Sequence, residues 1–188
     1  MVDLENLIRE CVKNNRQSQK KLYNLYSSKM FGICLRYSHN REEAEDILQE
    51  GFMKVFIGIG KYEGKGSFEG WVRRIMVNTA IEHFRKKKNN LHFDIMSESV
   101  IAVYSEDILD NISLEEIMKL VQKMPEGYRM VFNLFAVEGY THNEISDMLG
   151  IEVGTSKSQY SRARMYLQKV LKKINRVITK SDVHVSAR

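Results

Sequence analysis

The chain has 188 residues, 43% of them hydrophobic, with one proline and 11 glycines, a composition that favours a mostly helical protein of one or two small domains. The net charge is +5, no apolar run approaches the roughly 20 residues that span a bilayer, and the charged first residues lack the apolar core of a secretory signal. Cys11 and Cys34 have neither disulfide-framework nor metal-ligand spacing, so we expect both to be buried hydrophobic residues. From these features together we expect no cofactor, no membrane insertion and a cytoplasmic location.

The first half is predicted to contain two amphipathic helices separated by a loop. The stretch "NREEAEDILQEGFMKVFIGI" opens with Asn40 and Glu43 as a capping box, and its apolar residues then recur at spacings of three and four. The next stretch, "GIGKYEGKGSFEG", has five glycines and no regular period, which is typical of a loop. Ser67 is expected to cap the following helix, whose apolar stripe begins at Trp71 and which ends in "RKKKNN".

Two basic segments flank an acidic one. Residues 72–88 hold six Lys or Arg against Glu82 alone, and residues 155–180 hold eight with no carboxylate. Residues 89–110 hold five carboxylates, no Lys or Arg and no sustained period, so they are predicted to form a linker. This separation indicates polyanion contact at two places, although a solvated face is the commoner cause of any single run. The predicted parts are a first domain, a linker, a second domain and a tail: 1–88, 89–110, 111–178 and 179–188.

The second half is predicted to be helical again. Ser113 and Glu116 form another capping box at the start of "SLEEIMKLVQKM". Pro125 suits the first position of the next helix, which is expected to stop near Gly139.

The stretch "THNEISDMLGIEVGTSKSQYSRAR" predicts two helices joined by a tight turn. Thr141 and Glu144 form a capping box, and Gly150 can take the left-handed conformation that stops the first helix. Thr155 is expected to cap the second helix. Two short helices joined by a turn containing glycine are the signature of a helix-turn-helix.

The second of these helices is predicted to present a polar patch on the side opposite its apolar stripe, near its start: Lys157, Ser158, Ser161 and Arg162. The N-terminal end of a recognition helix enters the major groove, where Lys and Arg donate to guanine or phosphate and Ser serves either. The alternative is an ordinary helix pair with a solvated face. The absence of carboxylates over a full helix length after Thr155 favours DNA.

With these motifs the chain resembles the extracytoplasmic-function (ECF) sigma factors, which are two-domain members of the sigma-70 family of bacterial RNA polymerase specificity subunits. "AEDILQEGFMKVF" and "FEGWVRRIMVNTAIEHFRKKK" are similar to region 2 of that family, and the stretch from "MPEGYRMVF" to "SRARMYL" is similar to region 4. The resemblance implies an all-α fold with a region 2 helical bundle and a region 4 helix-turn-helix domain joined by an acidic linker. Ser156 and Gln159 stand where the family often has Val and Arg.

The resemblance also implies roles for individual residues. Those expected to dock on the β′ clamp helices of core RNA polymerase are Asp46, Gln49 and Glu50. Those expected to form a pocket for a flipped base of the promoter −10 element are Gly58, Tyr62 and Asn78. Those expected to hold its phosphates are Arg73, Arg74, Arg85, Lys86 and Lys87. Trp71 is assigned to the same −10 surface, with core packing as the favoured alternative. Those expected to contact the −35 element are Lys157, Ser158, Ser161, Arg162 and Arg164.

The expected function is promoter-specific transcription initiation without any catalytic activity of the chain's own. The implied partners are core RNA polymerase, through its β′ clamp helices and β flap, and promoter DNA. An anti-sigma factor is a further candidate partner, whose presence the sequence leaves open. One alternative is a free-standing helix-turn-helix regulator, which leaves the first domain without a task. A second is a metal-dependent hydrolase, for which the candidate ligands are His39, His83, His92, His142 and His184. These histidines lack ligand spacing, and no phosphate-binding loop is present.

Overall fold

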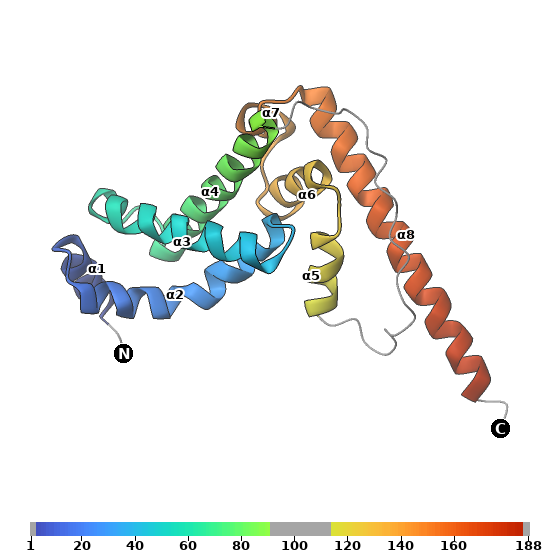
Figure 1. Cartoon of the computed structure of the whole chain (residues 1–188), viewed down its shortest axis with the longest axis horizontal. Coiled ribbons are helices and arrows are strands. Elements are labelled where there is room, and N and C mark those ends of the chain that lie inside the picture. Colours follow the sequence, from blue (N-terminus) through green and yellow to red (C-terminus); the bar gives the residue numbers. More distant parts are fainter. Residues whose placement is uncertain (1–2, 91–113, 186–188) are drawn as a thin grey trace. The chain divides into compact units, whose positions relative to one another are not determined.

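The computed structural model describes residues 3–90 and 114–185, and every regular element in these ranges is a helix (Figure 1). The predicted all-α class is therefore confirmed. The chain divides into two compact units, Met1–Asn90 and Leu91–Arg188. Most of the predicted linker, from residue 91 to residue 110, and the predicted cap at Ser113 lie outside the described residues.

The first unit is built from four helices and a short 3₁₀ turn: α1 (Leu4–Val12), α2 (Arg16–Tyr37), α3 (Arg41–Gly58), η1 (Ile59–Lys61) and α4 (Phe68–Asn90). Helices α2, α3 and α4 pack against one another in pairs, and α1 packs on α2. The largest fully buried apolar side chains of this core are Leu22, Met30, Ile47, Val55, Val72, Met76 and Val77. Cys11 and Cys34 are buried free thiols, as predicted, and burial raises the pKa of Cys34 to about 12.

Helices α3 and α4 approach each other closely where glycine faces methionine. A Cβ atom on Gly51 would lie only 2.3 Å from the Met76 sulfur atom, so no larger residue fits at this position without a shift. The cap of α3 differs in one detail from the prediction. The Asn40 side chain accepts from the Glu43 N–H at 2.8 Å, but the Glu43 carboxylate accepts from the His39 N–H at 2.7 Å instead of from Asn40. Ser67 caps α4 as predicted, by accepting from the Gly70 N–H at 3.1 Å.

The second unit contains α5 (Leu114–Gln122), α6 (Glu126–Phe132), the π-helical turn η2 (Asn133–Val137), α7 (His142–Leu149) and α8 (Val153–Val185). Helix α6 begins one residue later than predicted, because Pro125 is the N-cap. Gly139 takes a positive φ of 82°, which ends the segment where a stop was predicted. The buried Arg129 joins α6 to the end of α5 by donating to the Gln122 and Met124 carbonyls at 2.7 and 2.9 Å.

The start of α8 corrects one prediction. The helix begins at Val153, and the Ser156 N–H already donates to the Glu152 carbonyl at 3.0 Å. Thr155 is therefore the third residue of the helix and not its cap. The error arose because Thr is a good N-cap residue by type, whereas helical hydrogen bonding here begins two residues before it. Helix α8 also runs beyond residue 178, where the sequence placed the end of the second domain.

No helix within the described ranges is long and apolar enough to cross a membrane.

Candidate nucleic-acid interface

The outer face of α4 carries a line of aromatic and polar side chains. Trp71, Arg74 and Asn78 follow one another at spacings of three and four residues, so they lie on one face of the helix. Arg85 lies seven residues after Asn78, about two turns further along the same face. Arg74, Asn78 and Arg85 are exposed, whereas Trp71 and Arg73 are half-buried. This face offers cations and an amide to a ligand along most of the helix.

Aromatic rings gather at the N-terminal end of this face. The ring centroid of Trp71 lies 5.5 Å from that of Phe68 and 5.7 Å from that of Tyr62. A Cβ atom on Gly58 would lie 3.7 Å from the indole ring of Trp71. The Tyr62 hydroxyl donates to the Gly66 carbonyl at 2.8 Å, which fixes the far end of its ring. Trp71 thus makes packing contacts, as its place on the apolar stripe indicated, while part of its surface stays exposed.

The residues of the predicted base pocket are brought together only in part. Gly58 and Tyr62 lie beside Trp71. Asn78 stands apart from them, seven residues beyond Trp71, which is about 10 Å along the helix axis. A nucleic acid that contacts both places must therefore follow the outer face of α4. The pocket itself remains a prediction.

The basic end of α4 is divided between two surfaces. Lys87 forms an ion pair with Glu43 of α3, and Lys86 Nζ lies 3.9 Å from Glu50 Oε1, also on α3. Arg85 lies on the outer face instead and is exposed. Two of the cations predicted to hold phosphates are therefore already close to carboxylates of the same unit.

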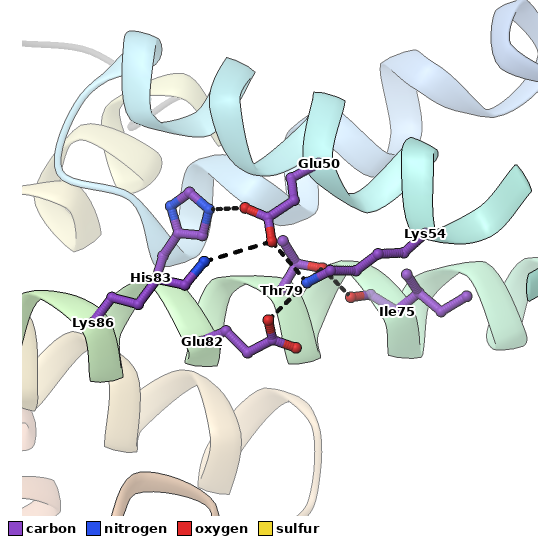
Figure 2. Close-up of polar contacts among 7 residues, drawn as sticks. All are labelled: Glu50, Lys54, Ile75, Thr79, Glu82, His83 and Lys86. Atoms are coloured by element: carbon purple, nitrogen blue, oxygen red, sulfur yellow. Dashed lines mark hydrogen bonds and ion pairs between the residues drawn. The ribbon is translucent and has the colours of Figure 1, made fainter. Parts of the chain in front are cut away.

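A cluster of charged side chains joins α3 to α4 (Figure 2). The Glu50 carboxylate contacts His83 Nε2 at 2.7 Å and Lys54 Nζ at 2.9 Å. Lys54 also donates to the Glu82 carboxylate at 2.8 Å and to the Thr79 hydroxyl at 3.3 Å. Hydrogen bonds from Lys54 and then from His83 lower the pKa of Glu50 from its ordinary 4.5 to about 2. Glu50 is consequently ionised at neutral pH, and its charge is directed at α4.

The three residues predicted to dock on polymerase do not share one environment. Asp46 and Gln49 are exposed on the outer face of α3, whereas Glu50 is half-buried and points toward α4. Met53 and Ile57 continue the outer face with side chains that are 64% and 82% exposed. Sequence reasoning missed these two apolar residues. The available signal was that both fall outside the apolar stripe of the helix.

A pocket of about 330 Å³ lies between α2 and α3, and Gln49 is one of its lining residues. Tyr23 and Phe31 supply aromatic surface. The guanidinium carbon of Arg41 lies 5.0 Å from the Phe31 ring centroid, and its Nε donates to the Glu45 carboxylate at 2.7 Å. The pocket therefore combines aromatic walls with the Glu45 carboxylate, which is already paired with Arg41 of the same chain.

Helices α7 and α8 form the predicted helix-turn-helix. The capping box is present, because the Glu144 N–H donates to the Thr141 hydroxyl at 3.3 Å and the Thr141 N–H donates to the Glu144 carboxylate at 2.8 Å. Gly150 ends α7 in the left-handed conformation, with φ 60° and ψ 48°. Ile145 and Leu149 are buried, and α7 packs against α8. The first turns of α8 are held by this packing at a fixed angle to α7.

These first turns present the predicted patch to solvent. The five residues expected to contact the −35 element are all exposed: Lys157, Ser158, Ser161, Arg162 and Arg164. The Ser158 hydroxyl donates to the Thr155 carbonyl at 2.9 Å, so it can offer a ligand only its lone pairs. The guanidinium carbon of Arg164 lies 6.0 Å from the ring centroid of Tyr160, one turn earlier. The patch is compact, cationic and open.

A histidine that sequence reasoning did not place in this site links the two helices beside the patch. His142, the first residue of α7, has its Nδ1 atom 2.9 Å from the hydroxyl of Ser156. Its ring stacks on Phe135 with centroids 4.4 Å apart. Ser156 itself is fully buried. The available signal was Ser156, a polar residue where the resembled family often has valine.

Within the described residues, the histidines considered as metal ligands do not gather. His83 is bonded to Glu50 and His142 to Ser156. Among the side chains that the structure describes, no three His, Cys, Asp or Glu residues are grouped as a metal ion requires. His92 lies outside the described residues, and so does the side chain of His184.

Two family models match successive parts of the chain, sigma-70 region 2 over residues 22–90 and sigma-70 region 4 over residues 114–167. The chain belongs to the sigma-70 family. Several of its curated relatives carry the names of extracytoplasmic-function members. "ECF RNA polymerase sigma factor SigW" of Bacillus subtilis is 29% identical over 177 residues, which cover 88% of this chain and 95% of that protein.

Two further relatives extend over similar lengths. "RNA polymerase sigma-H factor" of Pseudomonas aeruginosa is 26% identical over 183 residues, 89% of this chain and 95% of the relative. "ECF RNA polymerase sigma-E factor" of Haemophilus influenzae is 28% identical over 176 residues, 84% of this chain and 91% of the relative. The identification of the chain as an ECF sigma factor from its motifs is therefore confirmed.

The two matches map directly onto the two units. The region 2 match covers α2 from residue 22 onward, α3 and α4, and so includes the outer faces of α3 and α4. The region 4 match covers α5, α6, α7 and the first turns of α8, and so includes the helix-turn-helix and its patch. All the surfaces described above lie on the segments of this sigma-70 family member that the two family models match.

Proposed function

We propose that this sigma factor binds core RNA polymerase and directs it to promoters by reading their −35 and −10 elements. One observation carries the proposal: a region 2 unit and a region 4 unit follow each other on one chain, and each has an exposed basic helical surface. We propose further that the chain catalyses no reaction itself and that it acts in the cytoplasm, where polymerase and promoter DNA are found.

The patch on α8 is the proposed −35 reader. The N-terminal end of a recognition helix lies in the major groove, so Lys157 and Arg162 come within reach of guanine O6 and N7 or of phosphates. The Ser158 lone pairs can accept from a base amino group, since its proton is already used within the helix. Ser161 and Arg164 complete the contact surface with a hydroxyl and a further cation.

The outer face of α4 is the proposed −10 reader. Arg74 and Arg85 follow the sugar-phosphate backbone, and Asn78 between them supplies an amide for a base edge. At the N-terminal end of this face, Tyr62 and Trp71 supply rings on which an unpaired base can stack. Gly58 leaves room there because it has no side chain. Three more cations remain proposed phosphate contacts, Arg73, Lys86 and Lys87, of which Lys86 and Lys87 lie on the side of α4 that faces the α3 carboxylates.

The outer face of α3 is the proposed docking surface for the β′ clamp helices of polymerase. Asp46 and Gln49 are exposed and offer a carboxylate and an amide to cationic partner residues. Met53 and Ile57 add apolar area to the same face. We propose that the second unit contacts the β flap, as the family resemblance implies.

Binding to core RNA polymerase tests this proposal and separates it from a free-standing DNA-binding regulator. The wild-type chain should co-elute with purified core polymerase in gel filtration. Asp46→Lys should lower the affinity by roughly tenfold or more, because it sets like charges against each other at the interface. Glu63→Lys is the matched control, since Glu63 is an exposed carboxylate in the loop before α4 and should leave binding unchanged. A wild-type chain that does not bind core polymerase would contradict the proposal.

A further inference from the structure

The Glu50 carboxylate lies on α3, but its contacts extend to α4. Glu50 follows Asp46 by one helical turn, yet its two oxygens face α4 and not the outer face of α3 (Figure 2). Oε2 contacts His83 Nε2 at 2.7 Å, and Oε1 contacts Lys54 Nζ at 2.9 Å and lies 3.9 Å from Lys86 Nζ. A cation from a partner protein would have to compete with three neighbouring groups for this carboxylate.

These contacts fall on the part of α4 that is proposed to read DNA. His83 lies about one and a half turns beyond Asn78, Lys86 lies just over two turns beyond it, and Arg85 lies between them in the sequence. On the same side of the helix, Lys54 adds a second bridge to Glu82 at 2.8 Å. The cluster therefore fixes on α3 the segment of α4 that carries the exposed Asn78 amide and the exposed Arg85 cation.

We propose that Glu50 is a positioning residue for −10 reading: through His83 and Lys86 it sets the placement of α4 on α3, a task separate from any contact that it makes with polymerase. The inference rests on the proposed function. Glu50 belongs to the helix that docks, and two of its partners, His83 and Lys86, belong to the helix that reads. A fixed link between α3 and α4 means that docking α3 on polymerase also sets where the outer face of α4 meets the −10 strand.

The link is suited to positioning more than to holding the fold together. The α3–α4 contact already has a close-packed core, with Gly51 against Met76 and with Val55 and Val72 buried. The side chains of Glu50 and Lys54 are 32% and 33% exposed, so solvent screens their attraction and its contribution to stability is small. Variants of the cluster should therefore fold, and their defects should appear in DNA reading.

The test separates docking from reading in assembled polymerase. Each full-length variant is titrated with core polymerase to obtain its affinity. It is then assayed at saturating polymerase for binding of single-stranded −10 oligonucleotides in which each base is varied in turn. The variants are Glu50→Gln, His83→Ala and, as the matched control on the outer face of the same helix, Asp46→Asn.

The expected results differ among the three variants. At saturating polymerase, Glu50→Gln and His83→Ala should lose roughly fivefold in discrimination between the best and the next base, the scale of one solvent-screened charged hydrogen bond. His83→Ala should bind polymerase as the wild type does. Asp46→Asn should bind polymerase more weakly but show wild-type discrimination once saturated. The double variant Glu50→Gln/His83→Ala should be no worse than the poorer single variant, because both changes remove the same link. His83→Gln, which keeps a donor for Glu50, should recover part of the loss.

Three results would overturn the inference. The first is recovery of full discrimination by Glu50→Gln at saturating polymerase, which would make Glu50 a docking residue only. The second is wild-type discrimination in His83→Ala. The third is a loss of polymerase affinity in His83→Ala, which would mean that the link serves docking. Each of these leaves the proposed function intact, whereas failure of the wild-type chain to bind polymerase would contradict the proposed function itself.

Discussion

The cation of Lys157 disfavours a proton on His142, the histidine whose hydrogen bond to Ser156 joins α7 to α8. Burial is the larger cause and the Lys157 charge the second, and both lower the pKa of His142 below its ordinary 6.5. The folded helix-turn-helix therefore favours the neutral imidazole at this hydrogen bond. The residue that disfavours its protonation is also one of those proposed to contact DNA.

Acid should therefore destabilise the second unit through His142. Because the folded-state pKa is lower than the unfolded-state pKa, the unfolded chain binds the proton more readily once the pH falls below about 6.5, and stability is lost as the pH falls. His142→Gln cannot take up that proton. Thermal unfolding followed by circular dichroism at about pH 7.5 and about pH 5.5 should show a smaller drop in midpoint for His142→Gln than for the wild type. An equal drop in both proteins would exclude this role for His142.

Arg162 and Lys172 should differ in their effects on −35 binding. Arg162→Ala should cost about 1–3 kcal/mol and relax preference at one base position, if the guanidinium makes a bidentate base contact. Lys172 is exposed further along α8, and Lys172→Ala should weaken binding to all sequences alike and reduce the salt slope by about one unit. Fluorescence anisotropy on duplexes with each −35 base varied measures both effects. Uniform losses in both variants would show that Arg162 does not read bases.

Tyr62 and Asn78 should each matter for −10 reading, even though they are two turns apart along the site. Asn78→Ala and Tyr62→Ala should each impair open-complex formation by roughly 1–3 kcal/mol, the scale of one base contact. Tyr62→Phe keeps the ring and loses only the hydrogen bond to Gly66, so it should behave nearly as the wild type. Permanganate reactivity of melted promoter DNA measures the effect, and binding to an isolated −35 duplex serves as the control. If Asn78→Ala lowered the affinity for every −10 oligonucleotide equally, Asn78 would not be a base reader.

The Glu50 cluster should lose its stabilising effect in acid. The folded-state pKa of about 2 lies below the ordinary 4.5, so the stabilisation is complete above about pH 4.5 and is lost as the pH falls toward 2. The size of the effect is modest because a third of the side chain is exposed. In urea unfolding, the wild type should be more stable than Glu50→Gln at about pH 6, and the gap should narrow at about pH 3. A gap that stays constant with pH would contradict the assigned cause of the pKa shift.

The local features of the fold were largely predictable from the sequence. Asn40, Ser67 and the Thr141–Glu144 pair are caps that short-range patterns specify, and Gly150 is a stop of the same kind. The error at Thr155 shows the limit of this reasoning. The residue type suits a cap, but the position of the first helical hydrogen bond depends on how the turn packs.

The long-range contacts of the site were not predictable from the sequence. Glu50 and His83 are 33 residues apart, and Glu43 and Lys87 are 44 residues apart. Helical periodicity assigns a residue to a face, but it does not say which neighbouring helix that face meets. Asp46 and Gln49 are therefore exposed as a docking patch requires, whereas Glu50 faces α4. Lys86 likewise lies near a carboxylate of α3, although charge alone indicated a phosphate contact.

Run-off transcription by purified core polymerase, with and without this chain, shows whether the chain directs polymerase to promoters. The templates are promoter fragments from the genome that encodes the chain. We expect the chain to add transcripts that start downstream of a shared pair of −35 and −10 elements, and we expect Arg162→Ala to shift the preference within the −35 element. A transcript pattern that is the same with and without the chain would show that the chain does not direct initiation.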